Sequence, residues 1–575
     1  MFFFLTLIAS LAVNQPATAW DQTNTGCTPP RYEVIVVLAT ECPLAKLYAG
    51  RLNELARQYP QVQFRGVSAN AEDTPAEVAT FGKNLNFPFG SDSELLCKLG
   101  ATRSPEVFFL INDIVAYQGR IDDQYSPGTN RSQPNRHDLA EALRETLAFE
   151  PISLPKTTAV GCRITLPKPP AGELTFADVA TIVHRHCSGC HRPGEVGPMS
   201  LLTYQDVSGW REMIREVVND GRMPPWHADP AHGKFRNARG LSAAEKKTLF
   251  AWLDAGAPRG SVEPAEPRFK SGWSIRPDLV LRMEKPFDVP AEGILEYQDF
   301  VLTHDFAHDT WVQAVEIRPG NSAVVHHLTA LLRPKNGDPE RMYFDAMQDE
   351  YFAIMGPGNA VTTWPPGVAK LIPAGWQLVL EVHYQTIGTP QTDQSTIGLQ
   401  LVDARQVVQR AATRPMIKED IILPPHQVTT VLNEWRLEED LTLLSLVPHM
   451  HVRGRSMRIT ANSETLLNIP HYDFNWQHRY IFAEPKSFPR GTLIRATAVY
   501  DNTKDNPNNP DPSATVRHGP QTTDEMFQLN WDVTRTHENR HAGQYSQIAL
   551  LVMVVFGAIF VVSRFRSGGK SSLLT

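Results

Sequence analysis

The chain contains little cysteine, and the positions of its cysteines limit where disulfides can form. Six of the 575 residues are cysteine, and none lies beyond Cys190, so the rest of the chain must fold without disulfides. Basic residues are not in excess either, because the formal net charge is −7. This balance offers no basic surface for nucleic acid, and we expect no nucleic-acid partner.

Long apolar runs are also scarce, and the first of them resembles a targeting segment. Residues 1–19 are apolar and end in an A-x-A-like cleavage site, although no lysine or arginine precedes Arg31. The pattern predicts a signal peptide at 1–19. A buried N-terminal strand or helix is the alternative.

The second apolar segment lies near the other end of the chain. The uninterrupted apolar run Ile548–Val562 is followed by Arg564, Arg566 and Lys570. Basic residues after an apolar span favour the cytoplasmic side of a membrane. We therefore expect a transmembrane helix at 546–563 that anchors an exported protein in the inner membrane, with its main domains on the periplasmic or extracellular side. A buried core helix is the alternative.

Residues 27–160 show the order of elements found in many redox proteins. An apolar strand at 31–38 leads to Cys42 at the start of a helical pattern, and Pro105 precedes a further apolar strand. A thiol at a helix N-terminus has a lowered pKa and can be reactive. This arrangement resembles the thioredoxin/peroxiredoxin fold, which implies an α/β thioredoxin-like domain with a cis peptide bond before Pro105.

The cysteines of this segment leave several roles open. There is no C-x-x-C motif, because Ala45 stands at the position of the second cysteine. Cys42 could act alone as a peroxidatic nucleophile or could pair with Cys97. Cys27 and Cys162 flank the segment and could bridge its ends. A degenerate redoxin module that serves as a scaffold is a further alternative, and spacing alone does not decide the pairing.

A C-x-x-C-H motif follows the redoxin-like segment. It consists of Cys187, Cys190 and His191, which come directly after a helical pattern. In this motif two thiols add to the vinyl groups of a c-type haem, and the adjacent histidine supplies an axial ligand. The sequence therefore predicts one covalently bound haem, with a zinc half-site or a disulfide as the alternative.

The second axial ligand of this haem should come from later in the same segment. Met223 precedes two prolines and a closing helical pattern, and it resembles the axial methionine of class I cytochromes c. Met199 and Met213 are the alternatives. A His/Met pair raises the reduction potential and favours electron transfer. We therefore expect an all-α cytochrome c domain at 172–260.

Beyond residue 275 the pattern changes to short apolar runs separated by turn residues. Examples are Thr310–Ile317 and Trp376–Tyr384. Regular short strands with few helices favour β-sandwiches. We expect a first sandwich at 275–410 and a second at 411–536.

Histidines gather at several of these strands. The apolar run 441–447 leads into His449 and His451, and residues two apart on a strand point to the same face. The full set of candidate metal ligands is His326, His327, His383, His449, His451 and Met526. Imidazole and thioether favour copper over magnesium or calcium, and six ligands suffice for two three-ligand sites. Adjacent residues face opposite sides of a regular strand, so His326 and His327 can share an ion only if their strand is distorted.

In order and approximate spacing, these groups resemble the ascorbate-dependent type II copper monooxygenases. That family includes the peptidylglycine α-hydroxylating and dopamine β-hydroxylating enzymes. The resemblance covers about 275–535 and implies two jelly-roll sandwiches, each with one copper ion. It implies an electron-supplying copper on His326, His327 and His383. It also implies a catalytic copper, which activates oxygen and hydroxylates a C–H bond, on His449, His451 and Met526.

Two positions depart from the family pattern. Val447 stands where the amidating enzymes have an arginine, and Asn530 stands where they have a tyrosine. Both of those residues contact the peptide carboxylate in that family. A peptidylglycine substrate is therefore doubtful, and a more apolar substrate fits Val447 better.

Together these patterns predict a membrane-anchored copper monooxygenase that hydroxylates a small organic substrate with O2. The haem would supply electrons to the first copper and would replace or supplement ascorbate or another periplasmic donor. The alternative is a non-catalytic copper- and haem-containing redox or copper-binding protein. The expected fold class is multidomain: an α/β thioredoxin-like domain, an all-α cytochrome c domain, two all-β jelly-roll sandwiches and a C-terminal transmembrane helix.

Overall fold

The structure is a computed structural model of the chain. It describes residues 30–535 except 71, 127–128, 132, 167–171, 270–271, 294, 336–350, 357–359 and 520. The expected signal peptide at 1–19, Cys27 and the expected membrane span at 546–563 lie outside the described residues. Thirty strands and eight α-helices form the regular structure of the described part, and the last α-helix ends at Asp254.

The first region is built on a mixed five-stranded sheet in the order β3-β2-β1-β5-β6. Its central strand β1 runs parallel to β2 and antiparallel to β5. The β-branched residues of β1 are buried, as expected for a central strand. The strands are β1 (Tyr32–Leu38), β2 (Gln63–Ser68), β3 (Phe89–Ser91), β4 (Arg103–Ser104), β5 (Glu106–Ile111), β6 (Ile114–Gly119), β7 (Tyr125–Ser126), β8 (Thr129–Asn130) and β9 (Cys162–Arg163). The helices are α1 (Pro43–Gln58), α2 (Pro75–Gly82), α3 (Ser93–Leu99) and α4 (Asp138–Leu147).

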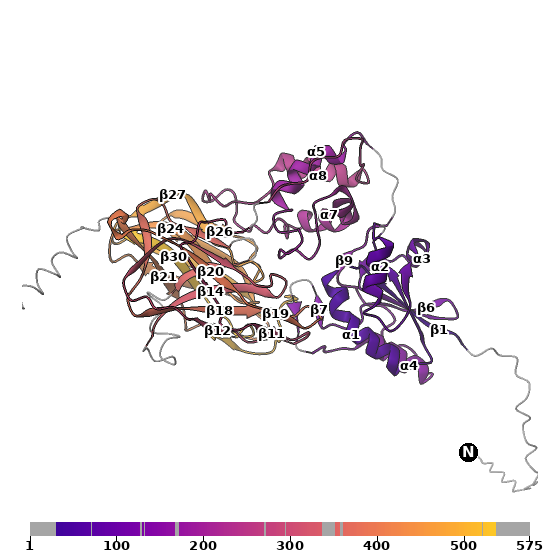
Figure 1. Ribbon diagram of the computed structural model, residues 1–575. Helices are drawn as coiled ribbons and strands as arrows, with labels where there is room; N and C mark the ends of the chain where they lie inside the picture. Colours follow the sequence, from indigo (N-terminus) through magenta and orange to yellow (C-terminus); the bar gives the residue numbers. More distant parts are fainter. Residues whose placement is uncertain are drawn as a thin grey trace, which may run out of the picture.

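Four further helices follow this first region, and their buried side chains belong to the same cluster as those of the sheet. They are α5 (Phe176–His186), α6 (Tyr204–Gly209), α7 (Arg211–Asn219) and α8 (Ala243–Asp254). Figure 1 shows α5, α7 and α8 together beside the first region. Helix α8 begins with a capping box formed by Ser242 and Glu245. Trp252 of α8 belongs to the same buried cluster as Val36 of β1. Arg103 of β4 also binds Glu216 of α7 at 2.9 Å.

The rest of the described chain is almost entirely β-structure. One nine-stranded sheet follows the path β10-β20-β13-β17-β21-β30-β24-β27, with β16 paired to β13. Two four-stranded sheets accompany it, β12-β18-β14-β15 in the first half and β23-β28-β25-β26 in the second. Separate buried clusters lie in the two halves.

The strands of the first half are β10 (Leu279–Arg282), β11 (Phe287–Val289), β12 (Gln298–Leu302), β13 (Thr310–Arg318), β14 (Val325–Pro334), β15 (Tyr351–Met355), β16 (Val361–Thr363), β17 (Val368–Ile372), β18 (Trp376–Tyr384), β19 (Gln391–Asp393) and β20 (Thr396–Leu401). A short 3-10 helix, η1 (Ala404–Gln406), follows. The strands of the second half are β21 (Gln409–Ile417), β22 (Ile422–Leu423), β23 (Val428–Arg436), β24 (Leu441–His449), β25 (Gly454–Ala461), β26 (Glu464–Ile469), β27 (Tyr480–Phe488), β28 (Leu493–Asp501), β29 (Val516–Arg517) and β30 (Gln528–Arg535).

The expected fold class is wrong for the helical segment. We expected an all-α cytochrome c domain at 172–260, but α5–α8 do not form a separate all-α unit within the described residues. Their buried side chains continue the core of the first sheet. Helical periodicity identifies an apolar face, but it does not identify the surface that covers this face.

Each half has its own four-stranded sheet and its own buried cluster, but the two halves are joined through the nine-stranded sheet. Strand β17 pairs in parallel with β21 through Val368 with Gln409 and Ala369 with Arg410. Two short segments therefore extend the hydrogen-bonded sheet from one half into the other. The described part of the chain is accordingly mostly β, with one continuous β-rich body (Figure 1).

The expected membrane anchor is not supported. No helix in the described part of the chain is long and apolar enough to cross a membrane. The apolar run on which the expectation rested, Ile548–Val562, lies beyond the last described residue. The predicted anchored localisation is therefore withdrawn.

Candidate metal centre

The first histidine cluster forms where strands β14 and β18 pair. His327 lies opposite His383 in the register, while Val325 lies opposite Tyr384. Val325 and His327 are two residues apart along β14, but their partners Tyr384 and His383 are adjacent on β18. His326 is therefore the extra residue of a β-bulge. A bulge bends the strand and redirects its side chains. This distortion explains how the adjacent His326 and His327 approach one another.

The three imidazoles of this cluster lie within reach of a single ion. Their candidate ligand atoms are all within 4.8 Å of one another. The Nδ1 atoms of His326 and His327 are 3.0 Å apart. Two nitrogens that each bind one metal ion at about 2.0 Å are separated by roughly this distance. The Nδ1 atom of His383 is buried and has no hydrogen-bond partner among the described residues. The donor set therefore fits a soft or borderline metal such as copper.

Burial keeps these imidazoles in the form that binds metal. It lowers the pKa of His326 to about 4 and that of His383 to about 3. The pKa of His327 falls well below its usual value, first through burial and then through the neighbouring histidines. All three rings are therefore neutral near pH 7, and a metal ion need not displace a proton from them.

The second cluster lies at the end of strand β24. The ring centroids of His449 and His451 are 5.2 Å apart. The Nδ1 atom of His449 donates to the side-chain oxygen of Gln477 at 2.8 Å. The Nδ1 atom of His451 donates to the Asp524 carbonyl at 3.3 Å. Both Nε2 atoms are thereby left as the metal-binding atoms, and each ring is oriented by a partner behind it.

Glu525 connects this pair of histidines to Met526. Its buried carboxylate accepts the backbone N–H groups of His451 at 2.9 Å, Arg453 at 2.8 Å and Met526 at 3.2 Å. Burial raises the pKa of Glu525 to about 7, even though these hydrogen bonds lower it. One side chain thus fixes the backbone of both segments that carry the expected ligands of the second cluster.

The two clusters lie side by side, with Phe474 in contact with both. The Phe474 ring centroid is 6.0 Å from that of His326, 6.2 Å from that of His383 and 5.8 Å from that of His451. His449 and His451 of the second cluster also help to lower the pKa of His327 in the first cluster. The sequence motifs gave no role to Phe474, Gln477 or Glu525. Glu525 directly precedes the candidate ligand Met526, and this position was the one available signal.

The C-x-x-C-H motif forms a tight turn at the end of α5. The N–H groups of Cys190 and His191 both donate to the Cys187 carbonyl, at 3.1 and 3.0 Å. The Nδ1 atom of His191 is buried without a hydrogen-bond partner in the described structure. A Cβ atom at Gly197 would lie 2.7 Å from this nitrogen, so the backbone passes close to the ring. These features fit the attachment of a haem, although they do not identify its second axial ligand.

The three candidate axial methionines differ in their surroundings. The sulfur of Met213 accepts the N–H of Arg163 at 3.3 Å, and its side chain packs on the helical core. Met199 also packs against this core. Met223 follows α7, where its N–H donates to the Val217 carbonyl at 3.0 Å. The assignment of Met223 as the second axial ligand of the haem stays a prediction.

The segment 234–239 connects the motif helix with the second cluster. Arg236 and Lys234 pair with Ile481 and Ala483 at the edge of β27, through N–H···O distances of 2.9 and 2.8 Å. At the other end, His186 of α5 donates to the Arg239 carbonyl at 3.2 Å. Strand β27 begins at Tyr480, two residues after His478, which is the neighbour of Gln477 in sequence.

His478 itself is buried against the loop that precedes this connecting segment. Its ring centroid is 5.9 Å from that of Trp226 and 5.7 Å from that of His227. Its Nε2 atom has no hydrogen-bond partner in the described part of the chain. His478 lies in none of the sequence motifs described above.

The cysteines of the first region occupy different environments. Cys42 is the N-cap residue of α1, and the Ser104–Pro105 bond is cis, as expected. Cys97 is exposed, whereas Cys162 is buried with its sulfur 2.8 Å from that of Cys42. Cys42 thus lies beside Cys162 and not beside Cys97, a contact that the sequence patterns did not predict, while Cys27 lies outside the described residues.

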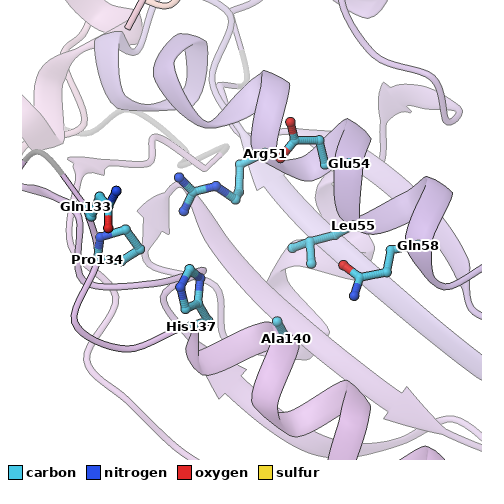
Figure 2. Close-up of a pocket in the computed structure, with 8 residues that line it drawn as sticks. All are labelled: Arg51, Glu54, Leu55, Gln58, Gln133, Pro134, His137 and Ala140. Atoms are coloured by element: carbon cyan, nitrogen blue, oxygen red, sulfur yellow. The ribbon is translucent and has the colours of Figure 1, made fainter. Parts of the chain in front are cut away.

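A surface pocket of about 390 Å³ lies apart from all of these groups, between α1 and the chain leading into α4 (Figure 2). Arg51 extends from α1 into it, toward Gln133 and His137. Arg51 is already held by Asp122. The lining residues include neither a thiol nor a second histidine, so the pocket provides no metal-ligand set.

Comparisons with known proteins leave the family open. No family model and no curated protein matches this chain. Among solved structures, an uncharacterised protein of Geobacillus kaustophilus is 26% identical and matches over 24% of this chain and 79% of its own, with a TM-score of 0.22. A secreted disulfide oxidoreductase of Mycobacterium tuberculosis is 22% identical over 15% of this chain and 67% of its own, with a TM-score of 0.14. The major capsid protein P2 of bacteriophage PM2 is 5% identical over 46% of this chain and 98% of its own, with a TM-score of 0.19.

Proposed function

We propose that this protein is a copper-dependent monooxygenase that hydroxylates a small organic substrate with O2. The observation that carries the proposal is the convergence of five imidazoles into two groups, both of which lie next to Phe474. Copper, when bound there, supplies one-electron transfer and the activation of oxygen. The chain's own part is to hold neutral imidazoles in two arrangements and to limit the access of water.

The two clusters suit different tasks. The first presents three imidazoles from paired strands and can hold an ion without a further ligand. The second presents two oriented imidazoles, with Met526 on a separate segment. A thioether is a weak, soft ligand that favours Cu(I), and fewer strong ligands leave room for an exogenous molecule. We therefore assign oxygen and substrate to the second cluster.

The surroundings of the second cluster favour a substrate without a carboxylate. Val447 and Asn530 lie opposite one another on β24 and β30. Both are buried, and the amide oxygen of Asn530 accepts a hydrogen bond from Gln528 at 2.9 Å. The residue at position 447 is an uncharged valine. A neutral or apolar small molecule fits these positions better than a peptide carboxylate does.

The proposal includes a c-type haem at Cys187, Cys190 and His191. Such a haem, when bound, supplies a one-electron donor. The residues fit its attachment, because two thiols flank a turn and an unpartnered imidazole nitrogen follows them. Segment 234–239 lies between this motif and β27, and it would keep the donor close to the histidine clusters.

Copper analysis with X-ray absorption on the full-length protein is the first test. We expect two copper ions per chain and a Cu(I)–sulfur signal that disappears in Met526→Ile. Met450→Leu is the matched control, because Met450 lies between the two histidines but is fully buried in the apolar core. A sulfur signal that survives Met526→Ile would contradict the assignment of the second cluster.

Oxygen uptake then separates an enzyme from a copper-binding protein. The copper-loaded protein would be supplied with reductant and screened against neutral organic substrates. Uptake that depends on substrate, with a hydroxylated product, is expected. A protein that binds two copper ions but shows no substrate-dependent uptake across the screen would favour the non-catalytic redox or copper-binding alternative.

A further inference from the structure

A pair of cysteines lies where the helices pack on the first sheet. Cys42 is the N-cap residue of α1, and Cys162 is the first residue of β9. Their sulfur atoms are 2.8 Å apart, although 120 positions separate them in the sequence. The histidine clusters use neither residue. The pair therefore calls for an explanation of its own.

Pairing between strands β4 and β9 brings the two residues together. Ser104 lies opposite Cys162 in this short ladder. The Cys42 thiol also donates to the Ser104 carbonyl at 3.2 Å. Gly161 approaches so closely that a Cβ atom there would lie 2.1 Å from the Ser104 carbonyl oxygen. Glycine is thus required before Cys162, and backbone contacts hold the two sulfur atoms near each other.

The two thiols differ in acidity. Burial raises the pKa of the Cys42 thiol, but hydrogen bonds from Cys162 and from the Ala45 backbone outweigh burial and lower the pKa to about 7. The hydrogen bond to Cys42, together with burial, raises the pKa of Cys162 well above its usual value. Near neutral pH the pair therefore provides a nucleophilic thiolate beside a protonated thiol.

We propose that Cys42 and Cys162 form a redox-active dithiol that exchanges with low-molecular-weight disulfides. The Cys42 thiolate attacks one sulfur of the small disulfide, whose S–S bond breaks and releases one thiolate. Cys162 then loses its proton and attacks the Cys42 sulfur, which forms the Cys42–Cys162 bond and releases the second thiolate. The pair is oxidised by two electrons, the small disulfide is reduced to two thiols, and both protons end on these products.

The contacts around the pair favour a small co-reactant. Trp210 donates its indole N–H to Glu41, the neighbour of Cys42, at 3.3 Å. Arg163, the neighbour of Cys162, lies 3.7 Å from Glu216 on α7. Both cysteines are buried. A folded protein substrate therefore has no direct approach to them in this conformation.

Peptide mapping of the full-length protein in glutathione redox buffers tests the proposal. Samples would be quenched in acid, alkylated and digested. We expect a peptide pair linked through Cys42 and Cys162, whose fraction follows the ratio of oxidised to reduced glutathione in both directions. Absence of this linked pair, a link from Cys42 to Cys97 instead, or a link that the folded protein cannot reduce would each overturn the proposal.

Variants separate the redox role from a purely structural one. In Cys162→Ser, a mixed disulfide of Cys42 with glutathione should accumulate, because no second thiol resolves it. Cys97→Ser should leave the linked fraction unchanged, since Cys97 is exposed and outside the pair. The rate of wild-type oxidation should rise with pH around 7, where the Cys42 thiolate forms. A wild-type rate without this rise would contradict the role of Cys42 as the attacking group.

Discussion

The two histidine clusters use the same side chain but hold it in different ways. In the first, three imidazoles come from the facing strands β14 and β18, and a bulge at His326 redirects one of them. In the second, two imidazoles come from one strand end, and each ring is oriented by its own partner, Gln477 or the Asp524 carbonyl. The first cluster is thus part of a sheet, whereas the second depends on loops around a strand.

This difference matches two different demands on a metal site. Side chains on paired strands are held by the hydrogen-bonded ladder, so an ion there can change charge with little rearrangement. Segments outside the ladder can adjust when a further molecule binds. An ion that only stores an electron is served by the first arrangement. An ion that binds oxygen needs a coordination position that the protein does not fill.

Removal of an imidazole from the first cluster should have the largest effect. In His383→Ala, only His326 and His327 remain, and we expect the copper content to fall by about one ion per chain. The second cluster should stay loaded, because none of its ring partners changes. His308→Ala is the control, since His308 is exposed and outside both clusters. Metal analysis after dialysis measures both variants, and an unchanged copper content in His383→Ala would contradict the comparison.

Much of the local structure behind this comparison could be predicted from the sequence. The apolar run Trp376–Tyr384 is strand β18 with the expected bounds, and the run 441–447 lies within β24. His449 and His451 do lie close together, although β24 ends at His449, so that alternation along a strand does not account for the place of His451. These features depend on residues near one another in the chain, where periodicity carries information.

The long-range features could not be predicted in the same way. The bulge at His326 depends on the register between β14 and β18, and the contact between Cys42 and Cys162 depends on two-residue strands. The common sheet depends on the pairing of β17 with β21. Such short pairings leave no periodic signal, because a few residues satisfy many alternative registers. The continuous core of the helices and the first sheet likewise depends on which apolar faces meet.

Glu525 should give a smaller effect that is confined to the second cluster. Burial raises its pKa from 4.5 to about 7, so the folded state keeps a proton that the unfolded chain releases. The stability that this proton provides is present at low pH and is lost as the pH rises through 7. In Glu525→Gln this dependence is absent. The free energy of unfolding of the wild type minus that of the variant should fall by on the order of 2–3 kcal/mol between about pH 5 and about pH 8.

Urea unfolding of the metal-free proteins measures this difference at each pH. The buried histidines change the free energy of unfolding with pH in the opposite direction. Both proteins contain them, so subtracting the free energy of the variant from that of the wild type removes their contribution. Glu484→Gln serves as the control, because Glu484 is exposed on β27 and should show no such trend. A difference that stays constant across this pH range would show that Glu525 is not a buried, titrating link between His451 and Met526.

Gln477 should give the smallest effect and the sharpest separation of the two clusters. The side-chain oxygen of Gln477 accepts a hydrogen bond from the Nδ1–H group of His449. The Nδ1 atom of His383 has no such partner in the described structure. Loss of such an orienting partner typically weakens metal binding by about 10- to 100-fold. In Gln477→Leu we expect about a tenfold weaker copper affinity at the second cluster only. Gln385→Leu, next to the first cluster, should leave both affinities unchanged, because the Gln385 side chain donates to the Ala323 carbonyl and not to a histidine among the described residues. Copper titration against a competing chelator resolves the two sites, and equal weakening at both would mean that they behave as one cluster.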